Sequence, residues 1–244
     1  MSATAYTRYE FLRAFRNWRF LIFSFIFPVA IYLLIAGPNR GEDDLGGSGI
    51  SAPLYFMVGL LAFGASMAVL ASGARIAAER AVGWNRQLRI TPLTTRAYFR
   101  AKIATGYLMA AVTIVLLYGS GMALGVRLPA GDWLAMTGLL LVGLVPFVPL
   151  GILIGHLLDA DSIGPAMGGL TAIFAFLGGT WYPLGDGVLK DIGEVLPSYW
   201  LVQASHVATG GGAWSATGWV VVAAWTVVLT ALAARAYRRD TRRA

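Results

Sequence analysis

The chain alternates between long apolar runs and short polar segments. Six stretches are almost continuously apolar and rich in Ala, Leu, Val and Gly: residues 20–36, 54–72, 103–125, 133–158, 163–181 and 218–234. A membrane-spanning helix needs about 20 predominantly apolar residues. Spanning strands would show alternating polarity instead, which these runs lack. The pattern therefore predicts an all-α integral membrane protein with six transmembrane helices.

Composition supports this class. Hydrophobic residues make up 57% of the 244 positions and charged residues 13%, whereas soluble domains carry about 25% charged residues. Cysteine is absent, which excludes disulfides, thiolate metal sites and thiol catalysis. Four arginines precede the first apolar run, and no Ala-x-Ala cleavage pattern follows it convincingly. We therefore expect the first span to be retained.

The cations are distributed unevenly about the expected spans. If the N-terminus is cytoplasmic, the other side of the membrane keeps only Arg40, Arg127 and Lys190. The acids beside these three are Glu42, Asp43, Asp44, Asp132, Asp186, Asp191 and Glu194. Lys and Arg collect on the cytoplasmic side of membrane proteins. We therefore expect a multi-pass protein of the plasma (inner) membrane with both termini cytoplasmic.

The net charge of +7 does not indicate nucleic acid, because the cations lie at the membrane borders and no aromatic-interleaved basic domain exists. Membrane lipids with anionic headgroups are the expected partner. The segment 4–19 places Phe11, Phe15 and Trp18 at helical spacing, with Arg13 and Arg16 turned away from them. This pattern predicts an amphipathic interface helix in the headgroup plane, or else an ordinary basic flank with aromatic belt residues.

Residues 73–102 form a basic segment between the second and third runs. It holds a single acid, Glu79, which is placed to pair with Arg75 one turn back. Its cations are Arg75, Arg80, Arg86, Arg89, Arg96, Arg100 and Lys102. This charge predicts a cytoplasmic loop.

Local signals divide this loop. Residues 76–88 can form a short helix that Pro92 stops, because proline cannot continue the helical hydrogen bonds. Thr94 or Thr95 can then cap the third span. Connectors of roughly 30 residues without their own structure are uncommon and usually functional. We expect a coupling helix that transmits force to the third span.

Other features concern packing and the outer side. The pairs Gly121/Gly125, Gly151/Gly155 and Gly164/Gly168 predict close helix contacts, within the chain or with a second copy. Pro146 and Pro149 predict a kink in the fourth span. The Gly-rich loop 38–52 is expected to be a mobile linker, and its Gly46–Gly49 string only weakly matches the Gly-x-Ser-Gly motif of intramembrane serine proteases.

The segment 178–215 combines interface aromatics with turn residues. It reads Gly178-Gly179-x-Trp181-x-Pro183, an amphipathic piece 188–196, and then Pro197-x-Tyr199-Trp200. Trp and Tyr favour the membrane interface, and non-helical backbone is tolerated there when packed against protein. We expect an outer segment that dips into the membrane boundary.

Two motif blocks resemble type-2 ABC exporter permeases. One is Glu79-Arg80, Gly83, Leu88-Arg89-x-Thr91-Pro92 and Lys102, which is similar to the loop that docks on an ATPase in that family; the other is the segment 178–215. The resemblance implies a single permease domain over 1–244, with an interface helix at 4–19, a coupling loop at 73–102 and a re-entrant outer hairpin at 178–215 between spans five and six. The implied coupling residues are Glu79, Arg80, Gly83, Arg86, Arg89, Thr91 and Pro92. The implied re-entrant residues are Gly179, Trp181, Pro183, Pro197 and Tyr199.

The same resemblance implies partners and cargo. Two copies of a cytoplasmic ABC ATPase would bind ATP and Mg²⁺, and this chain would hold no cofactor, in keeping with its lack of a phosphate-loop motif. A second permease copy would complete a homo- or heterodimer. The cargo would be amphipathic or hydrophobic: a drug, an antibiotic, a lipid or a lipid-linked glycan. Where many members have Gly-Thr and an acid, this chain has Gly83-Trp84-Asn85-Arg86, so Arg86 and Arg89 are expected to contact ATPase acids.

Two alternatives stay open. An intramembrane serine hydrolase would use Ser48 or Ser120 with His156 or His206. A sensor or assembly subunit would bind an ATPase but transport nothing. Ion-coupled transport is disfavoured, because the middles of the apolar runs contain no Asp, Glu, Lys or Arg.

Overall fold

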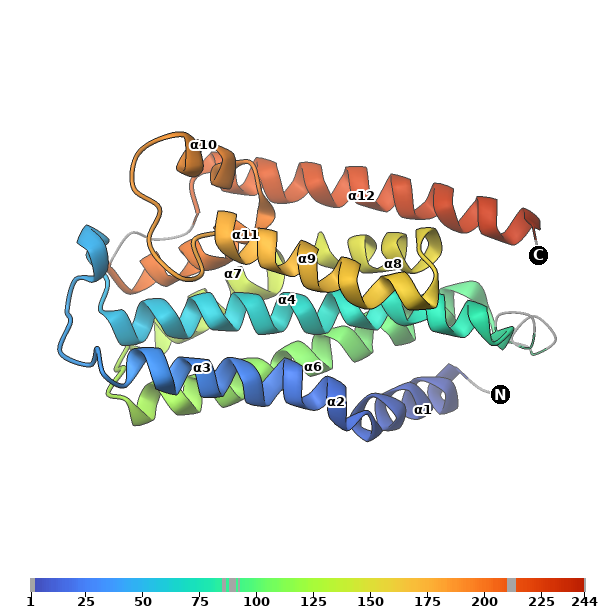
Figure 1. The fold of residues 1–244 in the computed structure, drawn as a ribbon, viewed down its shortest axis with the longest axis horizontal. Helices are drawn as coiled ribbons and strands as arrows, with labels where there is room; N and C mark the ends of the chain where they lie inside the picture. Colours follow the sequence, from blue (N-terminus) through green and yellow to red (C-terminus); the bar gives the residue numbers. More distant parts are fainter. Residues whose placement is uncertain (1–2, 85–86, 88–90, 92, 210–213, 244) are drawn as a thin grey trace.

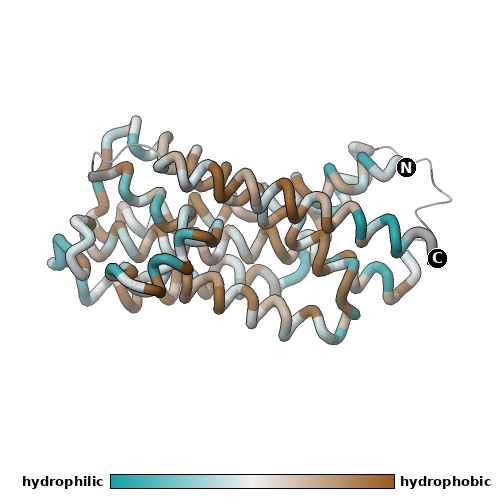
Figure 2. The backbone as a smooth tube through the Cα atoms, turned by 90° about the horizontal axis from the view of Figure 1, so that it is seen from above, coloured by the Kyte–Doolittle hydropathy of each residue, from teal (hydrophilic) through white to brown (hydrophobic). Residues whose placement is uncertain are grey.

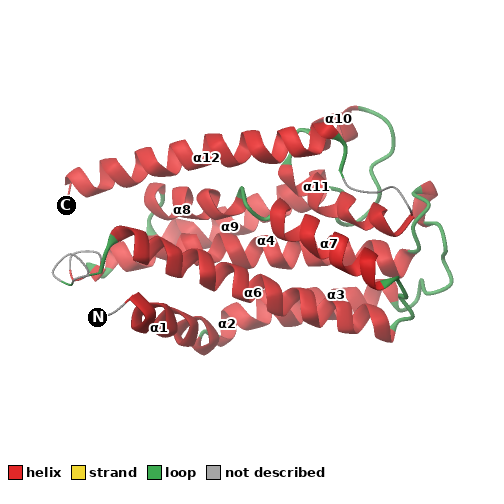
Figure 3. Ribbon diagram, turned by 180° about the vertical axis from the view of Figure 1, so that it is seen from behind, coloured by secondary structure: helices red, strands yellow, loops and turns green. Residues whose placement is uncertain are grey.

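The computed structural model describes residues 3–84, 87, 91, 93–209 and 214–243, and every regular element in this part of the chain is helical. The helices run lengthwise and form one elongated bundle (Figure 1). The long apolar helices are α4 (Ala52–Ala81), α6 (Thr95–Ala123), α7 (Ala130–Gly143) with α8 (Phe147–Leu157), α9 (Ala160–Leu177) and α12 (Ala216–Arg243). Loops gather at the two ends (Figure 3).

Five of these helical stretches are long and apolar enough to cross a membrane. The hydropathy of the backbone agrees, with apolar residues along the middle of the bundle and most polar residues at its ends (Figure 2). The first predicted span is shorter than expected, since the apolar helix there covers Ser24–Ala36. The prediction of an all-helical membrane protein is confirmed, whereas the described helices supply five long spans rather than six.

The first apolar stretch contains a π-helical segment just before Pro28. It consists of α2 (Trp18–Leu21), a π-helical segment η1 (Ile22–Ile26) and α3 (Phe27–Ala36). Proline has no N–H to donate to the carbonyl four residues earlier, which here belongs to Ser24. The hydroxyl of Thr113 on α6 donates to that carbonyl instead, at 3.4 Å. The irregularity is therefore stabilised by a contact between helices.

Helix α4 is the central element of the bundle. It packs against α3, α6, α8, α9 and α11. In its apolar 18-residue stretch 83% of the residues are buried, compared with 22% in the corresponding stretches of α9 and α12. Glycines allow the closest approaches, because a Cβ on Gly151 would lie 2.5 Å from the backbone oxygen of Leu70, and one on Gly155 would lie 2.6 Å from that of Gly73. The Gly151/Gly155 pair therefore mediates packing within the chain. A Cβ on Gly164 or Gly168 would meet nothing within 4 Å.

Proline also divides the fourth expected span. Helix α7 ends at Gly143 and α8 begins at Phe147, with Pro146 as its N-cap. The predicted kink is therefore confirmed.

The remaining elements lie at the ends. Helix α1 (Ala3–Arg16) precedes α2, and a short 3₁₀ turn, η2 (Leu45–Gly47), lies in the loop before α4. Between α9 and α12 come α10 (Val188–Glu194), α11 (Pro197–Gln203) and the 3₁₀ helix η3 (Ala204–Thr209). Both termini lie at the end of the bundle where α4 connects to α6 (Figure 1).

Candidate ATPase-coupling site

The segment between α4 and α6 is shorter than the predicted loop. Helix α4 continues without a break to Ala81, so the prediction of a separate helix over 76–88 is wrong at its start. The physical reason is the helix-favouring sequence around Ala77, Ala78 and Glu79, which contains no Gly or Pro before Gly83. We call residues 82–94 the connector.

Glycine and threonine define the ends of the connector. Gly83 has φ +69°, a left-handed conformation that favours glycine and commonly follows a helix C-terminus. Its N–H donates to the carbonyl of Arg80 at 3.0 Å. At the other end, the hydroxyl of Thr94 accepts from the N–H of Ala97 at 3.2 Å and caps α6, as predicted. The expected coupling residues Arg86, Arg89 and Pro92 lie outside the described residues, and Thr91 accepts from the N–H of Leu93.

Glu79 is completely buried and contacts two other helices. Its carboxylate accepts from Arg13 on α1 at 2.8 Å, from Lys102 on α6 at 2.5 Å and from the hydroxyl of Tyr98 at 2.6 Å. Lys102, itself only 1% exposed, also donates to Glu10 on α1 at 2.9 Å. We call Glu10, Arg13, Glu79, Tyr98 and Lys102 the Glu79 cluster. It joins α1, α4 and α6.

The charges of the Glu79 cluster affect groups on α1. Partial burial would lower the pKa of Arg13, but the carboxylates of Glu79 and Glu10 outweigh it and raise that pKa. Burial, followed by the charges of Glu10 and Glu79, raises the pKa of the Tyr6 phenol. Arg75 also interacts electrostatically with both acids. Arg13 therefore stays a cation and Tyr6 a neutral phenol at any physiological pH.

Arg80 contacts another part of the bundle. Its guanidinium donates to the carbonyls of Gly155, His156 and Leu158, at 3.3, 2.9 and 3.5 Å, and so binds the last turn of α8. It also pairs with Asp240 of α12 at 2.9 Å, and the same carboxylate lies 3.0 Å from Nδ1 of His156. We call Arg80, His156 and Asp240 the Arg80 cluster. It joins α4, α8 and α12.

Helix α1 differs from the prediction in one respect. The side chain of Arg13 faces the protein, because it binds the buried carboxylate of Glu79. Phe11 is half-buried, whereas Phe15 and Trp18 are exposed, as is Arg16. The aromatic face of α1 is therefore the outward one.

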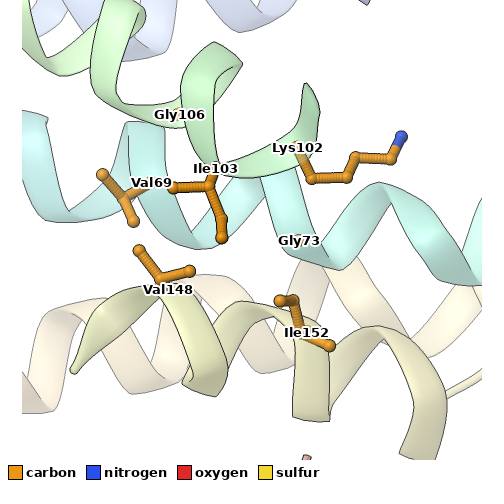
Figure 4. A pocket seen from close by; sticks show the side chains of 7 residues that line it. All are labelled: Val69, Gly73, Lys102, Ile103, Gly106, Val148 and Ile152. Carbon is orange, nitrogen blue, oxygen red and sulfur yellow. The ribbon is translucent and has the colours of Figure 1, made fainter. Parts of the chain in front are cut away.

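A small apolar pocket adjoins the Glu79 cluster. It lies between α4, α6 and α8 and is lined by Val69, Gly73, Lys102, Ile103, Gly106, Val148 and Ile152. Figure 4 shows the ammonium group of Lys102 pointing away from Val69 and Val148. Only the aliphatic stem of Lys102 therefore contributes to the pocket.

The described part of the segment 178–215 contacts the opposite end of the bundle at several points. The hydroxyl of Tyr55 donates to the carbonyl of Gly179, and the ring of Trp181 lies 6.1 Å from that of Phe63. Pro197 and Tyr199 are buried, and Pro183 is half-buried. Two tryptophans hold the end of α10, since Trp200 donates to the carbonyl of Glu194 at 2.9 Å and Trp225 donates to that of Val195 at 2.7 Å.

The candidate hydrolase residues have other contacts. Ser120 donates to the carbonyl of Leu116 at 2.8 Å, and the hydroxyl of Ser48 accepts from the N–H of Ile50 at 3.3 Å. His156 binds Asp240. These contacts bring neither serine to a histidine. Among the described residues, no three His, Cys, Asp or Glu side chains are grouped so that they could hold a metal ion.

Sequence reasoning did not anticipate Glu10, Tyr98 or Asp240. A simple signal was present, because the basic segments 1–19, 73–102 and 235–244 each contain one acid: Glu10, Glu79 and Asp240. All three acids form ion pairs inside the bundle. A lone acid in a basic border segment therefore marks a contact between helices here.

Comparisons with known proteins identify relatives among membrane transport proteins. The family model described as "ABC-2 family transporter protein" matches residues 47–235. A protein of Bacillus subtilis (strain 168) named "Putative transport permease YvfS" is 28% identical over 212 residues, which cover 84% of this chain and 81% of that protein. The matched region 47–235 contains Glu79, Arg80 and Lys102, whereas Glu10 and Asp240 lie outside it.

Proposed function

Because this chain belongs to the ABC-2 family of transporter proteins and is a transmembrane subunit of an ABC transporter, we propose that it forms the translocation pathway of an exporter. ABC-2 permeases associate with an ABC ATPase. In this proposal two copies of a separate cytoplasmic ATPase supply the energy, and ATP and Mg²⁺ bind there. The energy reaches the membrane helices through the connector.

One observation carries the proposal. Helix α4 enters the connector directly after Glu79 and Arg80, and these two residues are bonded to four other helices of the bundle. A displacement of the connector would therefore move packed helices rather than a loose loop. In this proposal Glu79 transmits the displacement, because it is buried, whereas Arg86 and Arg89 contact acids of the ATPase.

The orientation follows from charge. Both termini, the end of α4 and the start of α6 lie at the same end of the bundle (Figure 1), and the basic segments flank these elements in the sequence. The positive-inside rule favours a cytoplasmic location for this end, and the proposed location of the chain is the plasma (inner) membrane. The exposed apolar side chains of Leu12 and Phe15 on α1 and of Trp18 at the start of α2 would then lie among lipid headgroups.

The pathway is proposed to lie between two copies, because α4 fills the centre of the single bundle. Six spans per copy, counting residues 20–36 as the first, and a re-entrant segment 178–215 complete this arrangement. The cargo class is an amphipathic or hydrophobic molecule, such as a drug, an antibiotic, a lipid or a lipid-linked glycan. The apolar composition of the spans supports this class.

Co-purification tests the proposal. The native chain and an ABC ATPase encoded beside it should co-elute in detergent, and Arg86→Glu/Arg89→Glu should separate them by reversing the charge of the contact. Arg127→Glu, at the opposite end, is the matched control. Failure of the native pair to bind would contradict the proposal.

Transport assays then separate the alternatives. Vesicles containing both subunits should move an amphipathic dye only when ATP is supplied. Stimulated ATP hydrolysis without transport would favour a sensor or assembly subunit. Labelling of Ser48 or Ser120 by a fluorophosphonate probe would favour the hydrolase.

A further inference from the structure

Glu79 and Arg80 are consecutive residues whose side chains bind separate groups of helices. Glu79 binds Arg13 of α1 and Lys102 of α6. Arg80 binds Asp240 of α12 and three carbonyls at the end of α8. Neighbouring residues on a helix point about 100° apart, so one turn of α4 can hold two different neighbours. Both contacts lie within the last three residues of α4.

The two clusters share no side chain. The acids of the Glu79 cluster are Glu10 and Glu79, which are 1% and 0% exposed. The acid of the Arg80 cluster is Asp240, which is 23% exposed. Each cluster therefore has its own acids and its own cations, and one can be broken while the other keeps its ion pairs.

Burial of this much charge calls for a reason beyond stability. A buried ion pair is weak evidence for stability, because removing two charges from water costs about as much as their attraction returns. Its best-attested use is to fix how elements sit against one another. Here the elements fixed are α1 and the end of α12. Apolar and aromatic contacts alone would allow these two elements to slide along the bundle.

We propose that Glu79 and Arg80 are positioning residues that divide the ionic attachment of α4 between two clusters with separate ion pairs, one holding α1 and α6 and the other holding α8 and the end of α12. The use of this arrangement in transport rests on the proposed function above. A displacement at the connector then reaches both sides of the bundle at once. The separation concerns the ion pairs, because Tyr237 of α12 also contacts Thr95 at the start of α6 at 3.2 Å, and its ring packs against Phe99 of α6 and His156 of α8.

Hydrogen exchange tests the division without any ATPase. The full chain in lipid nanodiscs is compared with Arg13→Gln and Asp240→Asn, two substitutions at the partly exposed edges of the clusters. Arg13→Gln should speed amide exchange in residues 3–16 at least about threefold and leave residues 230–240 unchanged. Asp240→Asn should produce the opposite pattern. Asp186→Asn, in an exposed pair with Lys190, is the matched control and should change neither segment.

Central substitutions strengthen the test. Glu79→Gln should speed exchange of α1 by roughly tenfold or more, and Arg80→Gln should do the same for the ends of α8 and α12. The proposal would be overturned if every variant changed amide exchange similarly in α1 and at the end of α12. It would also be overturned if no variant changed exchange in either segment. If Glu79→Gln or Arg80→Gln fails to fold, Arg13→Gln and Asp240→Asn decide the outcome.

The role in coupling has a separate measurement. With the ATPase bound, Arg13→Gln and Asp240→Asn should each lower the number of cargo molecules moved per ATP hydrolysed, by about twofold or more, while the ATPase still co-elutes. Selective exchange with an unchanged transport ratio would overturn the coupling role alone. If the ATPase does not bind the native chain, that result counts against the proposed function instead.

Discussion

Glu79 and Lys102 are both almost fully buried, and their charged groups lie 2.5 Å apart. They belong to consecutive long helices, α4 and α6, and Lys102 also binds Glu10 of α1. Such a pair is costly to break from one side, because the remaining charge is left buried. The pair therefore offers the sharpest test of the packing at this end of the bundle.

Replacing Lys102 by Met should destabilise the chain strongly. The substitution keeps most of the aliphatic stem but removes the buried cation that Glu10 and Glu79 share, which leaves them only the partly exposed Arg13. We expect a loss of about 3–5 kcal/mol. Unfolding in mixed micelles measures the change. Lys190→Met, in an exposed pair, should be almost neutral. The double variant Glu79→Gln/Lys102→Met should lose less than the sum of the single losses, and strict additivity would contradict the ion pair.

A methyl group on Gly151 should be poorly tolerated. Its Cβ would lie 2.5 Å from the carbonyl oxygen of Leu70 on α4, which is backbone and cannot turn aside. We expect Gly151→Ala to cost about 1–3 kcal/mol through overpacking. Gly168→Ala is the control, because no described residue beyond its own helical turns lies within 4 Å of the added Cβ. Equal unfolding curves for the two variants would contradict the close α4–α8 crossing.

The start of α6 depends on Thr94. Its hydroxyl accepts from the N–H of Ala97, so Thr94→Ala should cost about 1 kcal/mol, whereas Thr94→Ser should retain the cap. Faster amide exchange in residues 95–98 of the alanine variant alone would support this role. Identical exchange in both variants would mean that the cap contributes nothing.

The end of α10 depends on two indole N–H groups. Trp200→Phe removes the bond to the carbonyl of Glu194, and Trp225→Phe removes the bond to that of Val195. Each loss should weaken the attachment of α10 by about 1 kcal/mol. The cysteine-free sequence allows a single spin label at position 189 to report the motion. Trp219→Phe is the control, and an unchanged label spectrum in both test variants would contradict the prediction.

The sequence predicted the local features better than the long-range ones. The apolar runs, the cap at Thr94 and the break at Pro146 depend on residues close together in the chain, so pattern and turn chemistry identify them. Local pattern does not identify the inward orientation of the Glu79 side chain, because that orientation depends on Arg13 and Lys102, which are 66 and 23 positions away. The continuity of α4 through residues 76–81 was not predicted, because the apolar pattern that indicates the span ends at residue 72 while the helix continues.

The lone acids of the basic segments face inward. Glu10, Glu79 and Asp240 are each the single acid in a basic segment. Exposed acids at these positions would only slightly weaken the charge asymmetry that favours a cytoplasmic location. Their retention is better explained by partners inside the bundle. The candidate contacts of Arg86 and Arg89 cannot be read in this way, because they concern a different protein chain.

The positions of the charges in the Glu79 cluster also bear on biosynthesis. Ribosomes make the chain from its N-terminus, so Arg13 is present before Glu79 is synthesised, and Lys102 follows only 23 positions later. An acid at the end of a nascent apolar helix is costly to leave unpaired in lipid. The order of synthesis supplies one cation before this acid and another soon after it, so that α4 and α6 can enter the membrane as a charge-compensated hairpin.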